Sequence, residues 1–144
     1  MKVEIEYGKL VASINFMYEL KLVRKQSRMR RRFINILNER LKVVEEDRKE
    51  LLQEHSRKDE NGEAIIKPDG NYDVKDMVAF SNDLKELYAE KLVIEGEDNR
   101  EMISTIKQIL KKLENEEYEG QTSEIYDYLC DQFGIDEEIE GGEE

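Results

Sequence analysis

Residues 34–55 of this sequence show a mostly apolar pattern that recurs at the spacing of one long α-helix. The positions that share a face are separated by steps of three and four residues. They are Ile34, Leu37, Leu41, Val44, Arg48, Leu51 and His55. Such positions lie along one side of an α-helix, as in the seam of a coiled coil. The sequence therefore predicts a long helix that runs to about Arg57. It leaves open whether residues 21–32 join this helix to the preceding one continuously or through a bend.

A second segment carries a matching stripe. Its apolar positions are Met77, Phe80, Leu84 and Leu87, again three, four and three residues apart. Asp73 can cap the start of this helix, because a carboxylate there can accept a bond from a free amide of the first turn. Two helices with the same seam spacing are expected to pack against each other in antiparallel orientation.

The segment between these two helices has the residues of a small β-hairpin. Asp59–Gly62 and Pro68–Asn71 are both turn signals, since glycine, proline, asparagine and aspartate favour turn conformations. The β-prone run Ala64–Ile66 lies between them, and Tyr72 would lie on the returning strand. The hairpin is expected to project from one end of the helical body.

Two short runs predict strands that pair with each other. Val3, Ile5 and Tyr7 alternate with charged residues, which is the period of a half-buried strand, and Gly8 ends the run. Residues 91–95 hold the β-prone triplet Leu92-Val93-Ile94. We expect residues 2–7 to pair with residues 91–95 in antiparallel orientation.

Three further helices follow from apolar stripes. The stripes are Leu10, Ile14, Met17 and Leu20, then Met102, Ile106, Ile109 and Leu113, and finally Ile125, Leu129 and Phe133. The first helix would cover about residues 9–22. Asp98–Glu101 has the form of a capping box for the second helix. Thr122 or Ser123 can cap the last helix, which Gly134 would end.

The predicted fold class is mainly α. It is an elongated helical bundle with long antiparallel helices, a small hairpin between two of them and one short strand pairing. A chain of 144 residues fits one domain. We therefore expect a single helical domain over residues 1–135. Residues 136–144 are expected to form a flexible acidic tail, since they hold six acidic residues and two glycines.

The residue types that usually carry solution chemistry are scarce. The single histidine, His55, has no nearby cysteine, and the single cysteine, Cys130, is expected to be a small apolar filler. Asp59–Gly62 does not continue as a calcium loop, because Ala64 stands where glycine is needed. Phosphate-binding glycine motifs are absent from the sequence. We therefore predict no catalytic residue, no metal site and no cofactor.

A dense basic segment is the most distinctive feature of the sequence. Its members are Lys21, Arg24, Lys25, Arg28, Arg30, Arg31 and Arg32, with no acidic residue among them. Residues 1–58 hold 15 Lys and Arg against 9 Asp and Glu, whereas residues 59–144 hold 8 against 26. The segment can bind a protein partner or the chain's own acidic half, can bind nucleic acid, or can be a solvated face. We take its seven members and Tyr72 as the candidate partner-binding residues.

Parts of the sequence resemble a known family. The resemblance lies in residues 25–38 (KQSRMRRRFINILN), residues 58–74 (KDENGEAIIKPDGNYDV) and Val93-Ile94-Glu95. These segments resemble small uncharacterised proteins of bacteriophages and prophages of Firmicutes, grouped as domain of unknown function 1617. The resemblance implies a phage gene, often in the late region near tail and lysis genes. It supplies no catalytic residues.

The expected function is that of a non-enzymatic bacteriophage accessory protein that binds another protein, associated with the virion or with late genes. One alternative is a phage-encoded inhibitor of a host enzyme or of an anti-phage defence system. Another is a nucleic-acid-binding accessory protein that uses residues 21–32. The single cysteine and the lack of a signal peptide or apolar span favour the cytoplasm of the infected host, or the virion. A homo-oligomer is compatible with the apolar stripes.

Overall fold

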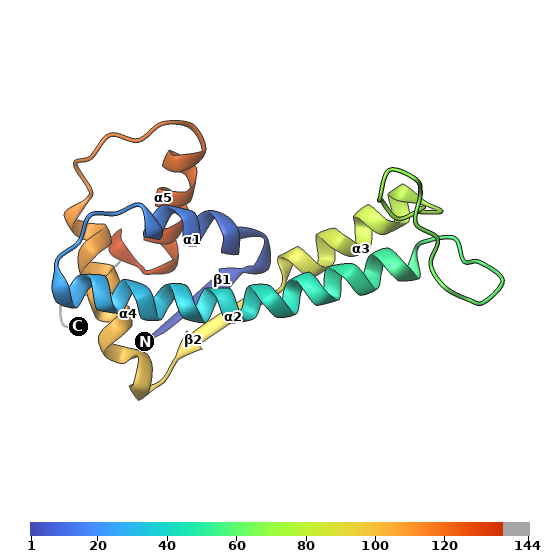
Figure 1. Cartoon of the computed structure of the whole chain (residues 1–144). Helices are drawn as coiled ribbons and strands as arrows, with labels where there is room; N and C mark the ends of the chain where they lie inside the picture. The colour runs from blue at the N-terminus through green and yellow to red at the C-terminus, as the bar shows by residue number, and fades with distance from the viewer. Residues whose placement is uncertain (137–144) are drawn as a thin grey trace.

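A computed structural model describes residues 1–136 of the chain. Its elements, in order, are β1 (Lys2–Glu6), the 3-10 turn η1 (Tyr7–Lys9), α1 (Leu10–Tyr18), α2 (Arg24–Glu54), α3 (Met77–Ala89), β2 (Lys91–Glu95), α4 (Glu97–Lys112) and α5 (Gly120–Gln132). Figure 1 shows a body at one end, from which α3 and the second half of α2 extend as an arm. The predicted class, mainly helical with a small antiparallel sheet, is confirmed.

The two strands pair in the predicted antiparallel orientation. Val3 lies opposite Ile94, and Ile5 lies opposite Leu92. These four side chains are buried, because every second residue of a strand points to the same face and this face meets the helices. The pairing joins the start of the chain to the segment that follows the arm.

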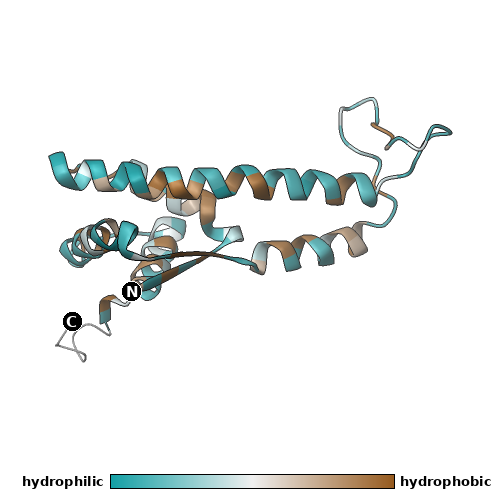
Figure 2. Ribbon diagram, turned by 90° about the horizontal axis from the view of Figure 1, so that it is seen from below, coloured by the Kyte–Doolittle hydropathy of each residue, from teal (hydrophilic) through white to brown (hydrophobic). Residues whose placement is uncertain are grey.

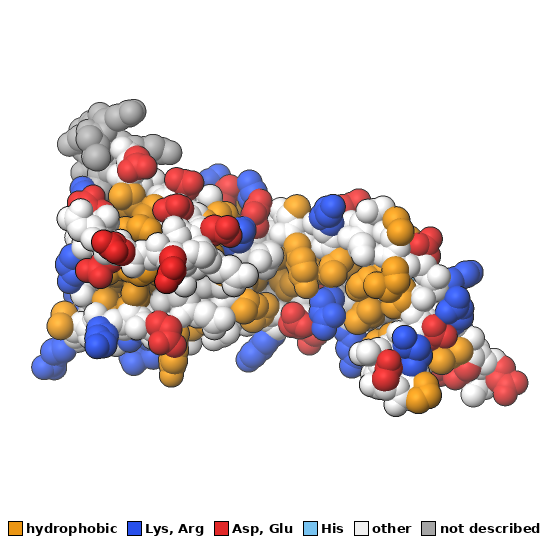
Figure 3. All heavy atoms as spheres, turned by 90° about the horizontal axis from the view of Figure 1, so that it is seen from above, with side chains coloured by type: hydrophobic (Ala, Val, Ile, Leu, Met, Phe, Trp, Pro, Cys, Tyr) orange, Lys and Arg blue, Asp and Glu red, His pale blue; other side chains and the backbone are white. Residues whose placement is uncertain are grey.

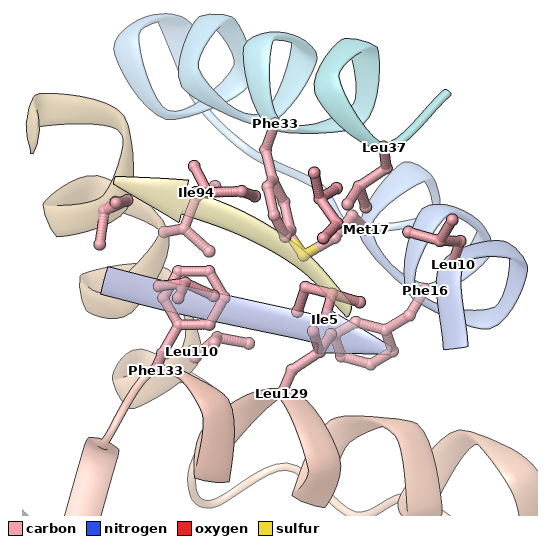
Figure 4. Close-up of a cluster of buried hydrophobic side chains, with 14 of the residues drawn as sticks. Ile5, Leu10, Phe16, Met17, Phe33, Leu37, Ile94, Leu110, Leu129 and Phe133 are labelled. Atoms are coloured by element: carbon pink, nitrogen blue, oxygen red, sulfur yellow. The ribbon is translucent and has the colours of Figure 1, made fainter. Parts of the chain in front are cut away.

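The core of the body forms where α1, α4, α5 and the first half of α2 close around this sheet. Figure 4 shows Phe33 from α2 directed toward the strands, with Phe133 below them. The two rings meet edge to face, with their centroids 5.6 Å apart. Aromatic rings favour this geometry because the edge of one ring is positive and the face of the other is negative. Phe33 and Leu37 are fully buried, so α2 supplies one wall of the core.

The arm consists of α2 and α3 lying side by side in antiparallel orientation, as predicted (Figure 1). Val44 from α2 and Leu87 from α3 are buried, and Leu41 and Leu84 are half-buried. Figure 2 shows brown segments recurring along α2 amid teal ones, as expected of a helix with an apolar stripe. The seam predicted in residues 34–55 therefore serves both the core of the body and the arm.

The arm ends in the predicted hairpin, formed by residues 55–76. Gly62 and Gly70 each donate a backbone bond that closes one of the two predicted turns. Isolated antiparallel bridges join Ser56 to Val74, Lys58 to Ala64, and Ile66 to Tyr72. The arm therefore ends in short bridged loops.

The predicted cap of α3 was wrong. Asp76, and not Asp73, accepts bonds from the amides of Val78 and Ala79, both at 3.1 Å. Asp73 is still part of the hairpin, where its carbonyl oxygen accepts from the amide of Arg57 at 2.9 Å. The chain is held extended there, so the helix can begin only after this pairing ends.

Three other predicted helix boundaries also differ. The first helix ends at Tyr18, and residues 19–23 form a non-helical bend before α2. At α4 the N-cap is Gly96, with φ at 100°, in place of a capping box at Asp98–Glu101. Strand β2 ends directly before this glycine, so the chain must turn at once.

The last helix begins at Gly120, without the predicted cap from Thr122 or Ser123. The amide of Ser123 already bonds the carbonyl oxygen of Glu119 at 3.4 Å, so both residues lie inside the helix. Of the predicted acidic tail, only Asp136 falls within the described residues.

Candidate interaction surfaces

Arg30 lies in the middle of the basic segment but points into the fold. Its Nη1 atom donates to the carbonyl oxygens of Met17 at 3.1 Å and Tyr18 at 3.3 Å, and also to that of Leu20. These carbonyl groups belong to the end of α1 and the bend after it, where a helix leaves acceptors without intrahelical partners. Arg30 therefore fixes α1 against α2.

Lys25, another member of the segment, contacts α4. Lys25 forms an ion pair with Glu101, with Nζ and Oε2 2.8 Å apart. This bond lowers the pKa of the Glu101 carboxyl, and the nearby charges of Arg32 and Arg28 lower it further. Part of the positive charge is therefore balanced within the fold.

Four exposed side chains of the segment form a cationic surface, which we call the basic face. It consists of Lys21, Arg24, Arg28 and Arg31. Arg24, Arg28 and Arg31 are spaced four and three residues apart and so share one side of α2, over about 10 Å at 1.5 Å per residue. Within residues 1–136, no carboxylate forms an ion pair with any of the four side chains.

The start of α2 adds to this positive potential. Its N-cap, Val23, makes no side-chain capping bond, and the first turn contains no acidic residue. The free amides at a helix N-terminus carry a partial positive charge, and cationic side chains there are unfavourable. The basic face is thus a surface on which an anionic group would be stabilised.

Tyr72, the other candidate residue, lies at the far end of the arm. Its hydroxyl oxygen accepts a bond from Nε2 of Gln53 at 3.2 Å, next to the end of α2. The 31 residues of α2 span about 45 Å at 1.5 Å per residue. The structure therefore separates Tyr72 from the basic segment and does not form one site from them.

Apolar side chains are exposed around this end of the arm. Ile66 is 58% exposed, Met77 58% and Val78 72%. Together with Tyr72 they define what we call the arm-tip surface. Orange side chains are visible over the arm in Figure 3. A hollow of about 450 Å³, lined by Tyr72, Ile66 and the end of α2, adjoins this surface.

Sequence reasoning missed most of the arm-tip surface. It placed Met77 on the buried stripe, whereas Met77 is the first residue of α3 and is exposed. The signal lay in the adjacent pair Met77-Val78, because neighbouring helical residues point about 100° apart and cannot both enter one seam. The sequence around Ile66 did not indicate its exposure. In a short β-prone run either face can be the buried one, so the pattern does not say which side chains point to solvent.

His55 joins the arm tip to α3. Its Nε2 atom lies 2.7 Å from Oδ2 of Asp83, and its ring packs edge to face on Phe80 at 5.9 Å. The amide of Lys75 donates to its carbonyl oxygen at 2.7 Å. His55 is on the arm and Cys130 is on α5 in the body, so the structure does not bring these two residues together (Figure 1). Burial raises the pKa of the Cys130 thiol.

Three tyrosines of the C-terminal part, Tyr118, Tyr126 and Tyr128, pack against the core. Tyr118 and Tyr126 cluster with Phe16, with ring centroids between 5.1 and 5.8 Å apart. The Tyr126 hydroxyl donates to the carbonyl oxygen of Leu110 at 2.8 Å, and the Tyr128 hydroxyl accepts from the amide of Glu6 at 2.9 Å. An open hollow of about 670 Å³ lies beside this cluster, between α1 and α5.

The described part of the chain holds no helix long and apolar enough to cross a membrane, and no group of three or more potential metal-ligating side chains. In comparisons with known proteins, no family model, no curated protein and no solved structure matches this chain. The resemblance to phage proteins therefore stays a prediction from the three segments that carry it.

Proposed function

We propose that this chain is a non-enzymatic accessory protein of a bacteriophage or prophage that binds another protein through its arm-tip surface. The observation that carries the proposal is the exposure of Ile66, Met77 and Val78 at the end of a two-helix arm. Exposed apolar side chains at such a position supply the area that partner binding removes from water. Tyr72 adds a residue type that is frequent at binding hot spots.

The contacts at the base of the tip support this proposal. Asp76 caps α3, His55 contacts Asp83 and Phe80, and Arg57 contacts Asp73 at 2.8 Å. The first two contacts hold the tip against α3, and the third closes the hairpin on itself. A preorganised surface binds more tightly, because less conformational entropy is lost on association.

The resemblance to phage proteins supplies the biological setting. A late-gene product would use the arm in virion assembly or in another accessory step. A host-directed inhibitor would use the same geometry to occupy the surface of a host enzyme or defence protein. The two settings differ in the partner and not in the surface.

A pull-down from infected cells with tagged variants tests the proposal. In the tip variant, Ile66, Met77 and Val78 are each replaced by serine. In the matched control, serine replaces Val11, Tyr18 and Val23. These side chains lie on the body and are 52%, 71% and 70% exposed. We expect the tip variant to lose its specific partner and the control to retain it. Equal capture by both variants would refute binding through the tip. Mass spectrometry of purified virions then separates a virion component from a host-directed inhibitor.

The basic face favours a second candidate function, the binding of nucleic acid. Its unpaired side chains could contact phosphates, and such binding would weaken steeply with salt. The replacements Arg24→Glu, Arg28→Glu and Arg31→Glu should then abolish a gel shift seen at low salt. If the unmodified chain gives no shift at low salt, this candidate is eliminated.

A further inference from the structure

Strand β2 pairs with β1 on one side, and within residues 1–136 no strand pairs with its other edge. The amide of Tyr7 donates to the carbonyl oxygen of Glu90 at 2.8 Å, which extends the ladder by one pair and fixes its hydrogen-bonding phase. In an antiparallel ladder, residues whose backbone groups bond the partner strand alternate with residues whose groups point away. The residues of β2 whose amide and carbonyl groups point away from β1 are therefore Lys91, Val93 and Glu95.

The two outer edges of this sheet differ in what covers them. The edge of β1 meets α5, because the outward amide of Glu6 donates to the hydroxyl oxygen of Tyr128 at 2.9 Å. On the edge of β2, the carbonyl oxygen of Glu95 accepts from Nδ2 of Asn99 at 3.0 Å. The outward amides and carbonyl oxygens of the other two residues have no hydrogen-bond partner in the described part of the chain. Such unpaired groups are a template for pairing with a further strand.

The residues of this edge are complementary to a second copy of themselves. When two β2 strands pair in antiparallel orientation around Val93, each Val93 lies opposite the other, and Lys91 of each copy lies opposite Glu95 of the other. The outward backbone groups also meet in this register. All three side chains are exposed and lie on one face of the sheet. Opposite charges directly across two strands are stabilising, whereas the like charges that parallel pairing in register would bring together are destabilising.

We propose that two copies of this chain dimerise through their β2 edges and so form one four-stranded antiparallel sheet. The contact is isologous, with a two-fold axis beside Val93. Nζ of Lys91 already lies 3.6 Å from Oε1 of Glu4, so in the dimer it lies between this carboxylate and Glu95 of the second copy. Each copy contributes one strand of five residues, and an interface this small binds weakly, with a Kd of about 10 µM to 1 mM. The inference concerns the body and does not depend on the arm-tip surface.

Sedimentation equilibrium of the full chain at concentrations up to about 1 mM tests the dimer. We expect a monomer–dimer equilibrium, which Lys91→Glu and Glu95→Lys should each weaken about tenfold by placing like charges opposite each other. The double variant restores opposite charges and should recover the original affinity. It does not restore the contact of Lys91 with Glu4, so recovery assigns the effect to the pairing between copies. A chain that stays monomeric, or a double variant as weak as the single variants, would overturn the proposal.

Amide hydrogen exchange of the unmodified chain tests the register without any substitution. The amide of Val93 is open in the monomer and bonded in the dimer, so its exchange should slow at high protein concentration. The amides of Leu92 and Ile94 point to β1 and serve as internal controls, with a much smaller change. Val93→Pro removes the outward donor, leaves the bonds to β1 and should abolish the dimer, because proline is tolerated on an edge strand. Protection that rises with concentration elsewhere but not at Val93 would overturn the proposal.

Discussion

Replacing Arg30 with alanine removes a guanidinium that holds the end of α1. The side chain donates to carbonyl oxygens of Met17, Tyr18 and Leu20, and it is half-buried. A hydrogen bond from a charged donor contributes about 1.5–3 kcal/mol to stability. The three bonds share one nitrogen, and the Tyr18 carbonyl is exposed and can bond water, so their contributions do not add in full. We expect Arg30→Ala to lower the free energy of unfolding by about 2 kcal/mol.

Arg31 is the matched control, because it is the same residue type at the next position and is exposed. Arg31→Ala should change the free energy by less than about 0.5 kcal/mol, as is usual for surface substitutions. Urea denaturation followed by circular dichroism measures both. By the size dependence of thermal unfolding, Arg30→Ala should also lower Tm by roughly 4–8 °C. Lysine at position 30 should recover only part of the loss, because it lacks the planar fork of donors.

Equal losses for the two alanine variants would refute the assignment of Arg30 to the α1 carbonyls. A loss below about 0.5 kcal/mol for Arg30→Ala would refute it as well, since measurable bonds of this kind exceed that value. The result also bears on function. If Arg30 is structural, experiments that reverse the charge of the basic segment must leave it unchanged, or lost folding will be read as lost binding.

Three other predictions follow from the described contacts. Phe33→Ala should cost about 3–5 kcal/mol in urea denaturation, because it opens a cavity opposite Phe133, and a loss under 1 kcal/mol would contradict the observed burial. Asp76→Ala should cost about 1 kcal/mol through the lost cap, more than Asp73→Ala; the reverse order would restore Asp73 as the cap. Burial raises the pKa of Cys130, so the thiolate fraction at pH 8 is smaller when the chain is folded. Iodoacetamide should therefore label the folded chain much more slowly than the urea-unfolded chain, and equal rates would contradict this.

The regular elements could be predicted because their signals are local. The stripe from Ile34 to Leu51 and the alternation of Val3 and Ile5 follow from the periods of helix and strand, which neighbouring residues fix between them. The hairpin was predicted for the same reason, from its turn residues. The pairing of β1 with β2 joins distant segments and was inferred only from the β-prone character of both. Helix ends were predicted less well. Asp73 and Asp76 are both acceptable caps by residue type, and only the pairing of Asp73 with Arg57 across the hairpin decides between them.

The sequence alone determined that positive charge gathers in residues 21–32 and that negative charge prevails later in the chain. Tertiary structure decided how that charge is divided. It directs Arg30 onto α1, pairs Lys25 with Glu101, and leaves Arg24, Arg28 and Arg31 exposed on the surface. It also leaves Met77 58% exposed, although Met77 belongs to the apolar stripe of α3. The physical reason is the same in each case: periodicity fixes the direction of a side chain on its own helix, but the element packed opposite fixes what that side chain meets.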